Sequence, residues 1–210
     1  MNYELELIQK VSAKLQLDLS GKVVLTEVGT GAFGYIGLIA ALSNAKKVIC
    51  WTKDSEYGKA SDNIKWIQNK IIEWDISDVP FEFSILEKPT RHIKEADIIT
   101  NSGFTRPFNQ CFINEMNDNA VISLMMEAWE FRESDIDLDY AHQKNVKVGG
   151  TWENHPSLKI FDQCGPLAAK LIKDSGFKLN MNKVLIISSD HFGSITKNEL
   201  QTKYKCKTTK

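Results

Sequence analysis

The stretch VVLTEVGTGAFGYIGLIAAL (Val23–Leu42) places a strand, a glycine-rich loop and a helix in direct succession. β-branched residues between turn signals indicate the strand, and the segment after the loop is typical of a helix. The loop contains a complete G-x-G-x-x-G pattern in Gly29, Gly31 and Gly34. In this context the pattern predicts either a loop that binds a phosphate or adenosyl group, or a tight turn inside an α/β domain.

The rest of the chain repeats the alternation of strand and helix. The expected strands are nearly continuous apolar runs, which is typical of parallel strands covered by helices on both faces. Right-handed crossovers between them predict an α/β fold, with a flavodoxin-like or Rossmann-like, doubly wound parallel sheet in three layers. The further strands are expected at KVICWT, FEFSIL, ADIITN, AVISLMM, VKVGGT and KVLIIS, with helical segments between them.

The composition of the chain limits the classes of protein and of binding partner that fit it. The 210 residues carry a net charge of −1, so bulk charge attracts neither nucleic acid nor an anionic membrane. The acidic, amphipathic N-terminus does not resemble a signal peptide, and no apolar run approaches the roughly 18 residues of a membrane span. The four cysteines are widely spaced, and no His or Cys spacing indicates metal ligands. We therefore expect a cytoplasmic protein that binds a small molecule.

The residues after the second strand bear on a dinucleotide interpretation of the loop. A dinucleotide site needs an acid at the end of that strand, about 20 residues after the loop, to bind a ribose hydroxyl. The strand ends at Thr52, Lys53 follows, and Asp54 comes two residues late. Asp54 could reach a ribose only if its loop curls back, so both the dinucleotide and the simple-turn interpretations stay open.

The loop also resembles the first motif of class I S-adenosylmethionine methyltransferases. Glu27 is followed by Gly29 and Gly31, as in that motif, and the later ADIITNSG is loosely similar to the fourth strand of the family. The resemblance implies S-adenosylmethionine as an alternative cofactor. The chain departs from the family at Thr52, where the family has a ribose-binding acid.

The segment ADIITNSGFTRPFNQCFINEMNDNAVISLMM, and then SDIDLDYAHQKNVKVGGTWENHP, resembles the catalytic domain of D-isomer-specific 2-hydroxyacid dehydrogenases, the formate and glycerate dehydrogenase group. The resemblance covers about residues 84–200 in the order and spacing of elements. It implies a flavodoxin-like, catalytic-type domain over 1–155. Over 156–210 it implies a long interdomain helix and the first strand of a truncated or vestigial domain for NAD(P).

The resemblance also locates the cofactor loop of that second domain. The family would have glycines at 188, 190 and 193, and the chain has Ser188, Asp190 and Gly193. Asp190 would bring a carboxylate against a pyrophosphate. The catalytic Arg, Glu and His of the family would follow Lys210, so no catalytic residue can be assigned.

We therefore expect a homologue of the catalytic, substrate-binding domain of NAD-dependent 2-hydroxyacid dehydrogenases that is not a complete oxidoreductase by itself. A small S-adenosylmethionine-dependent methyltransferase and a non-catalytic binding or partner module are the alternatives. A homo-oligomer could form through the C-terminal helix and strand. The lysine-rich tail QTKYKCKTTK has no apolar period and is expected to fray.

Candidate cleft residues follow the expected strands at their carboxyl ends, where open α/β sheets bind ligands. Loop amides and Arg106 could bind a carboxylate or a phosphate, and His155 could act as an acid or base. We expect the loops at 29–34, 101–107, 127–132 and 150–155 to lie along one edge of the sheet. The candidates are Gly29, Gly31, Gly34, Ser102, Gly103, Arg106, Glu127, Trp129, Arg132 and His155.

Overall fold

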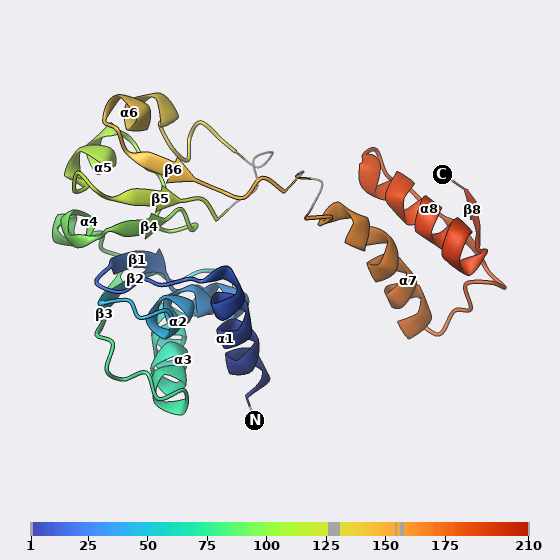
Figure 1. Ribbon diagram of the computed structural model, residues 1–210, viewed down its shortest axis with the longest axis horizontal. Helices are drawn as coiled ribbons and strands as arrows, with labels where there is room; N and C mark the ends of the chain where they lie inside the picture. The colour runs from blue at the N-terminus through green and yellow to red at the C-terminus, as the bar shows by residue number, and fades with distance from the viewer. Residues whose placement is uncertain (1, 126–130, 154, 156–157, 210) are drawn as a thin grey trace. The chain divides into compact units, whose positions relative to one another are not determined.

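The computed structural model describes residues 2–125, 131–153, 155 and 158–209. The chain divides into two compact units, Met1–Thr151 (unit 1) and Trp152–Lys210 (unit 2). Unit 1 contains a six-stranded sheet, and unit 2 contains a two-stranded one (Figure 1).

The sheet of unit 1 has the strand order β3-β2-β1-β4-β5-β6, and all its strands are parallel. The predicted α/β, doubly wound class is confirmed, and of the two orders it allowed the chain has the Rossmann-like one. In that order the chain reverses direction across the sheet between β1 and β4. The strands are β1 (Val23–Glu27), β2 (Lys47–Thr52), β3 (Phe81–Ile85), β4 (Ile98–Thr100), β5 (Val121–Ser123) and β6 (Lys147–Gly149).

Helices lie on both sides of this sheet (Figure 1). A 3-10 turn, η1 (Gly31–Gly34), leads from β1 into α2. One side has α1 (Tyr3–Leu15), α2 (Tyr35–Leu42) and α3 (Ala60–Glu73); the other has α4 (Thr90–Glu95), α5 (Gln110–Glu115) and α6 (Leu138–Gln143).

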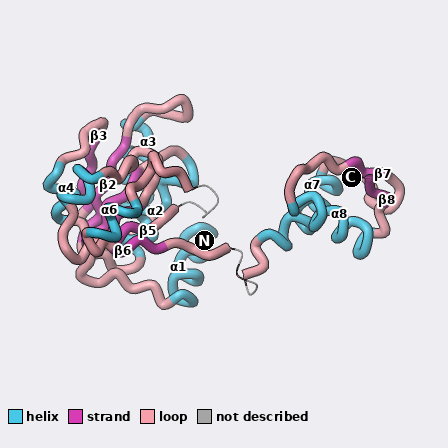
Figure 2. Tube along the Cα trace, turned by 90° about the horizontal axis from the view of Figure 1, so that it is seen from above, coloured by secondary structure: helices cyan, strands magenta, loops and turns pink. Residues whose placement is uncertain are grey.

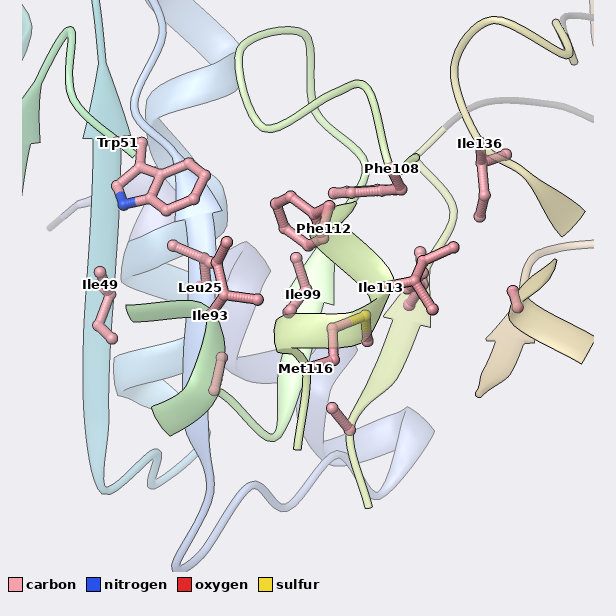
Figure 3. Packing of buried hydrophobic residues seen from close by; sticks show 14 of the residues in the cluster. Leu25, Ile49, Trp51, Ile93, Ile99, Phe108, Phe112, Ile113, Met116 and Ile136 are labelled. Carbon is pink, nitrogen blue, oxygen red and sulfur yellow. The ribbon is translucent and has the colours of Figure 1, made fainter. Parts of the chain in front are cut away.

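The two apolar clusters of unit 1 follow from the alternation of side chains along each strand. In β2, Val48 and Cys50 pack with α2 and α3, whereas Ile49 and Trp51 belong to the cluster on the opposite face. Figure 3 shows Ile49 and Trp51 in this second cluster, which also contains Phe112 of α5. Strands buried on both faces explain why the sequence shows apolar runs rather than alternation.

A buried polar chain ties β2 to α4 and β3. Trp51 Nε1 donates to Nδ1 of His92 at 2.9 Å, and His92 is fully buried. Because Nδ1 accepts this bond, Nε2 carries the proton and donates to Glu82 at 2.8 Å. Glu82 also pairs with Lys47 and Arg91, and these hydrogen bonds, that of Lys47 first, lower the pKa of Glu82 to about 2.

An apolar groove of about 680 Å³ runs beside α2 along the central and later strands of the sheet. Ile36 and Ile39 of α2, Val121 of β5 and Val148 of β6 are among its lining residues.

Unit 2 contains a parallel strand–helix–strand unit and one further helix (Figure 2). In place of the expected long helix, unit 2 has a 3-10 turn followed by a helix that begins at Cys164. Pro166 lies in the first turn of this helix, where proline is tolerated. The elements are η3 (Phe161–Gln163), α7 (Cys164–Asp174), β7 (Lys183–Leu185), α8 (His191–Tyr204) and β8 (Lys207–Thr209).

The lysine-rich tail does not fray, contrary to expectation. It contributes the end of α8 and all of β8, which pairs with β7 from Lys183↔Lys207 to Leu185↔Thr209. Cys206 is buried in the small core of this unit with Leu200. Backbone hydrogen bonds, which the side-chain pattern does not reveal, hold this segment.

Candidate functional site

The loops after β1 and β4 meet at the carboxyl edge of the sheet of unit 1. Since β1 and β4 are neighbours while the chain leaves them in opposite directions, this edge is the topological switch point, where open α/β sheets bind ligands. Glu27, the last residue of β1, accepts a hydrogen bond from the backbone N–H of Phe104 at 2.5 Å. This bond ties the end of β1 to the loop after β4.

Buried hydroxyl groups hold the loop after β4 in place. The hydroxyl of Thr100 lies 2.8 Å from that of Thr26 in β1 and 2.8 Å from that of Ser102. Thr105 donates to the carbonyl oxygens of Thr100 and Ser102 at 2.6 and 2.8 Å. Ser102 is therefore a supporting residue of the loop, because its hydroxyl already bonds within the protein.

A pocket of about 280 Å³, here called the switch-point pocket, opens beside this loop. Asn101 is 2% exposed; its Oδ1 accepts from the backbone N–H of Met125, and its Nδ2 has no hydrogen-bond partner among the described residues. Arg106 pairs with Asp135, whereas Arg132 forms no ion pair in the described part of the chain. The pocket is lined by Phe33, Ile36, Asn101, Ser102, Gly103, Arg106, Met125 and Arg132.

Each of the three glycines of the first loop is required for a different structural reason. Gly31 has a φ of +66° and open space around its absent Cβ, so it permits the left-handed turn after Thr30. At Gly34 a Cβ would lie 2.5 Å from the ring of Trp66, so this glycine allows α3 to approach the start of α2. At Gly29 a Cβ would lie 3.0 Å from the Cβ of Phe33. Close packing against the side chains of Phe33 and Trp66 therefore explains Gly29 and Gly34 without a nucleotide.

The residues at the end of β2 do not form the ribose site that NAD requires. Thr52 is buried, and its hydroxyl donates to the carbonyl oxygen of Val28 at 2.8 Å. Asp54 accepts from Lys59 and from the N–H of Ala60 at the start of α3, and the bond from Lys59 is the first cause that lowers the pKa of Asp54. The late carboxylate is thus engaged in the protein itself.

The expected cofactor loop of unit 2, at residues 188–193, is filled by its own side chains. Asp190 is the N-cap of α8 and accepts from the N–H of Phe192 at 3.1 Å. Ser188 donates to Asp190 at 2.6 Å and accepts from the N–H of Gly193 at 3.2 Å. A phosphate would compete with a carboxylate that already holds the helix N-terminus, so this loop does not fit a pyrophosphate.

The remaining predicted residues belong to unit 2 or fall outside the described residues. Glu127 and Trp129 fall in the segment that is not described. His155 belongs to unit 2, where its ring lies 5.2 Å from that of Trp152. Within the described ranges, no group of three or more His, Cys, Asp or Glu side chains could hold a metal ion. No helix of the described chain has the length and apolar character that a membrane crossing requires.

Sequence reasoning identified the loop but missed its most distinctive residue. Ser102, Gly103, Arg106 and Arg132 were predicted and line the pocket. Asn101 was not singled out, although it directly follows an apolar strand. A polar residue that ends a buried run at a switch point is the signal that could have found it.

No family model matches the chain, and no curated protein matches it. Solved structures of several enzymes resemble it. Shikimate 5-dehydrogenase from Listeria monocytogenes, in complex with shikimate and NAD, has a TM-score of 0.49 and 14% identity over 67% of this chain and 49% of that chain. Dipicolinate synthase A chain from Bacillus subtilis has a TM-score of 0.49 and 17% identity, over 81% and 54%. Formate dehydrogenase from Granulicella M. has a TM-score of 0.39 and 14% identity, over 72% and 42%.

The chain spans about half the length of the first two of these structures. At these identities and TM-scores, the likeness carries no argument about activity.

Proposed function

We propose that unit 1 is a substrate domain of the 2-hydroxyacid dehydrogenase type, which binds a small carboxylic acid in the switch-point pocket. The observation that carries the proposal is the buried Nδ2 group of Asn101, which has no partner among the described residues and lines this pocket. A buried donor without an acceptor costs about 1–3 kcal/mol. A ligand oxygen beside Asn101 would recover that energy.

A carboxylate suits the other groups of the pocket as well. Arg132 supplies a guanidinium that forms no ion pair within the described ranges, and guanidinium groups bind carboxylates with two parallel hydrogen bonds. Phe33, Ile36 and Met125 offer an apolar wall for the carbon skeleton. The volume of about 280 Å³ lies just below the usual range for drug-sized ligands, which favours a short hydroxy or oxo acid.

Oxidation of such an acid would use a nicotinamide cofactor, which accepts a hydride when bound. The chain's own residues do not fit NAD at either loop, because Thr52 and Asp54 are engaged at the first and Ser188 and Asp190 fill the second. We therefore assign to this chain the binding and orientation of the acid, and we assign no hydride-transfer step to it.

A methyltransferase is the second candidate, and one observation favours it. Glu27 lies beside the first glycine loop, with Oε1 3.7 Å from the Cβ position of Gly29, where a carboxylate suits the positive charge of S-adenosylmethionine. Against it, the other oxygen of Glu27 already accepts from Phe104, and Thr52 is buried and offers no carboxylate to a ribose. A non-catalytic binding module would use the same pocket, and since no hydride-transfer step is assigned to this chain, acid binding alone does not separate it from the first candidate.

Calorimetry of the full chain tests the proposal. We expect glycolate, glyoxylate or lactate to bind, and the neutral amides of the same acids to bind at least tenfold more weakly. Asn101→Asp keeps the side-chain shape but replaces the free donor with a carboxylate oxygen, and Arg132→Gln removes the guanidinium. Each should weaken acid binding about tenfold or more, since one charge-assisted hydrogen bond is worth about 1.5–3 kcal/mol.

Arg91→Gln is the matched control, because Arg91 is an exposed arginine that pairs with Glu82 far along the sheet from the pocket residues. Equal binding of acids and amides would refute the proposal, as would acid binding that Arg132→Gln leaves unchanged. Binding of S-adenosylmethionine that Gly31→Val abolishes would favour the methyltransferase instead.

A further inference from the structure

We propose that Lys53 and Lys88, beside the ring of Phe104, form a binding site for a phosphate monoester. The site goes beyond the carboxylate pocket and is argued from different residues. Lys53 directly follows β2, Lys88 lies between β3 and α4, and Phe104 lies in the loop after β4. The carboxyl edge of three parallel strands therefore contributes to it.

Both ammonium groups lie close to one aromatic ring. The Nζ of Lys53 is 5.1 Å from the ring centroid of Phe104, and the Nζ of Lys88 is 4.8 Å from the same centroid. Lys88 also lies 5.9 Å from the ring centroid of Trp51 and donates to the carbonyl oxygen of Arg106 at 2.7 Å. These contacts hold Lys88 in a half-buried position at the rim of the switch-point loop.

Neither ammonium group is neutralised by a direct ion pair among the described residues. In the described part of the chain, no carboxylate forms an ion pair with Lys53 or Lys88. Burial lowers the pKa of Lys88, the charge of Lys53 lowers it further, and Glu27 acts in the opposite direction. Glu27 already accepts from the N–H of Phe104, so part of its charge is directed into the loop.

A phosphate monoester matches this arrangement better than a carboxylate does. It carries a charge of about −1.5 to −2 at pH 7, which two ammonium groups can neutralise, and it offers three acceptor oxygens. Lysine binds phosphate as a point charge that needs no fixed planar geometry. The charge repulsion between the two lysines would fall when the dianion binds.

The position of Lys53 in the fold gives a second argument. In Rossmann-like sheets the residue at the end of the second strand selects the adenosine ribose, and a cation there accommodates a 2′-phosphate where an acid would bind the free hydroxyl. Thr52, the alternative polar group at this place, is engaged with Val28. The phosphate monoester then belongs either to a 2′-phosphorylated adenosine or to a phosphorylated small molecule.

Calorimetric titration of the full chain at low ionic strength tests the site with inorganic phosphate, 2′-AMP, 5′-AMP and glycerol 3-phosphate. We expect phosphate compounds to bind and to compete with one another. Tighter binding of 2′-AMP than of 5′-AMP and glycerol 3-phosphate would identify the adenosine source. Tighter binding of glycerol 3-phosphate would identify the small-molecule source, and either result supports the site.

Lys53→Gln should weaken phosphate binding about tenfold or more, and Lys53→Arg should restore most of it. Lys65→Gln is the matched control, since Lys65 is an exposed lysine of α3. Lys88→Gln should have the same effect as Lys53→Gln, with circular dichroism used to verify its fold. Absence of phosphate binding, or binding that Lys53→Gln leaves unchanged, would overturn the proposal. Glycolate binding is measured on the same variants, because a loss of phosphate binding with unchanged glycolate binding concerns this site and not the switch-point pocket.

Discussion

Gly34→Ala should destabilise unit 1 because the new methyl group would meet a large ring at very short range. The Cβ position of residue 34 lies 2.5, 3.1 and 3.3 Å from three carbon atoms of Trp66. Contacts below 3 Å require one partner to move. Trp66 is constrained, since its ring makes an edge contact with Tyr35 at a centroid distance of 5.1 Å. Overpacking of this kind costs about 1–3 kcal/mol.

Urea unfolding followed by tryptophan fluorescence measures this loss, because Trp51, Trp66 and Trp74 all lie in unit 1. The double variant Gly34→Ala/Trp66→Leu should be less destabilised than the sum of the two single changes, by about the magnitude of the clash. Strictly additive single changes would refute the argument that Trp66 is the reason for glycine at position 34. So would a Gly34→Ala protein with wild-type stability.

Three further predictions concern buried or capping hydrogen bonds. Trp51→Phe removes the donor to buried His92 and should lower the free energy of unfolding by about 1–3 kcal/mol, measured by urea titration with far-ultraviolet circular dichroism. Glu82 has its pKa lowered from 4.5 to about 2, so the stability it contributes is complete above pH 4.5 and is lost as the pH falls toward 2. Thermal unfolding of Glu82→Gln should therefore depend less on pH between 4.5 and 2 than that of the wild type; parallel curves would contradict this. Asp190→Ala removes the N-cap of α8 and should destabilise unit 2 by about 1 kcal/mol, seen as faster amide hydrogen exchange in α8 but not in α3.

The positions of the strands in unit 1 could be predicted from sequence, and their order could not. Buried strands such as KVICWT are visible as apolar runs because both their faces are covered. The sequence of the run FEFSIL does not indicate which strand lies beside it in the sheet. In the structure this strand, β3, pairs with β2 in the register Val48↔Phe81. The edge of β1 that β2 does not occupy is therefore free to pair with β4. Only this pairing distinguishes the Rossmann-like order from the flavodoxin-like one.

The candidate site was predictable in its location and less so in its chemistry. The rule that ligands bind beyond the carboxyl ends of parallel strands led to Ser102, Gly103 and Arg106. The rule does not reveal which polar groups are already bonded. Ser102 supports the loop and Arg106 pairs with Asp135, while the Nδ2 group of Asn101 has no hydrogen-bond partner among the described residues. Hydrogen-bond satisfaction depends on residues far apart in the chain, so it becomes visible only in three dimensions.

In unit 2 the sequence pattern failed where backbone pairing decides the structure. β8 consists of Lys207, Thr208 and Thr209, which carry no apolar signal, yet they pair with β7. Leu185 and Ile187 are exposed, while Val184 and Ile186 pack against the small core. A homo-oligomer through this region stays a prediction, which light scattering of the purified chain would test.

The central place of β1 also has a consequence for the order in which the chain folds. During synthesis from the N-terminus, β1, β2 and β3 can pair before β4 has been made, which leaves one edge of β1 open. The hydroxyl bond between Thr26 and Thr100 joins residues 74 positions apart, and contacts at such separation slow folding. Until they form, the open edge of β1 can pair with a strand of another nascent chain. The junction beside the candidate site is therefore exposed to misassembly until β4 has been made.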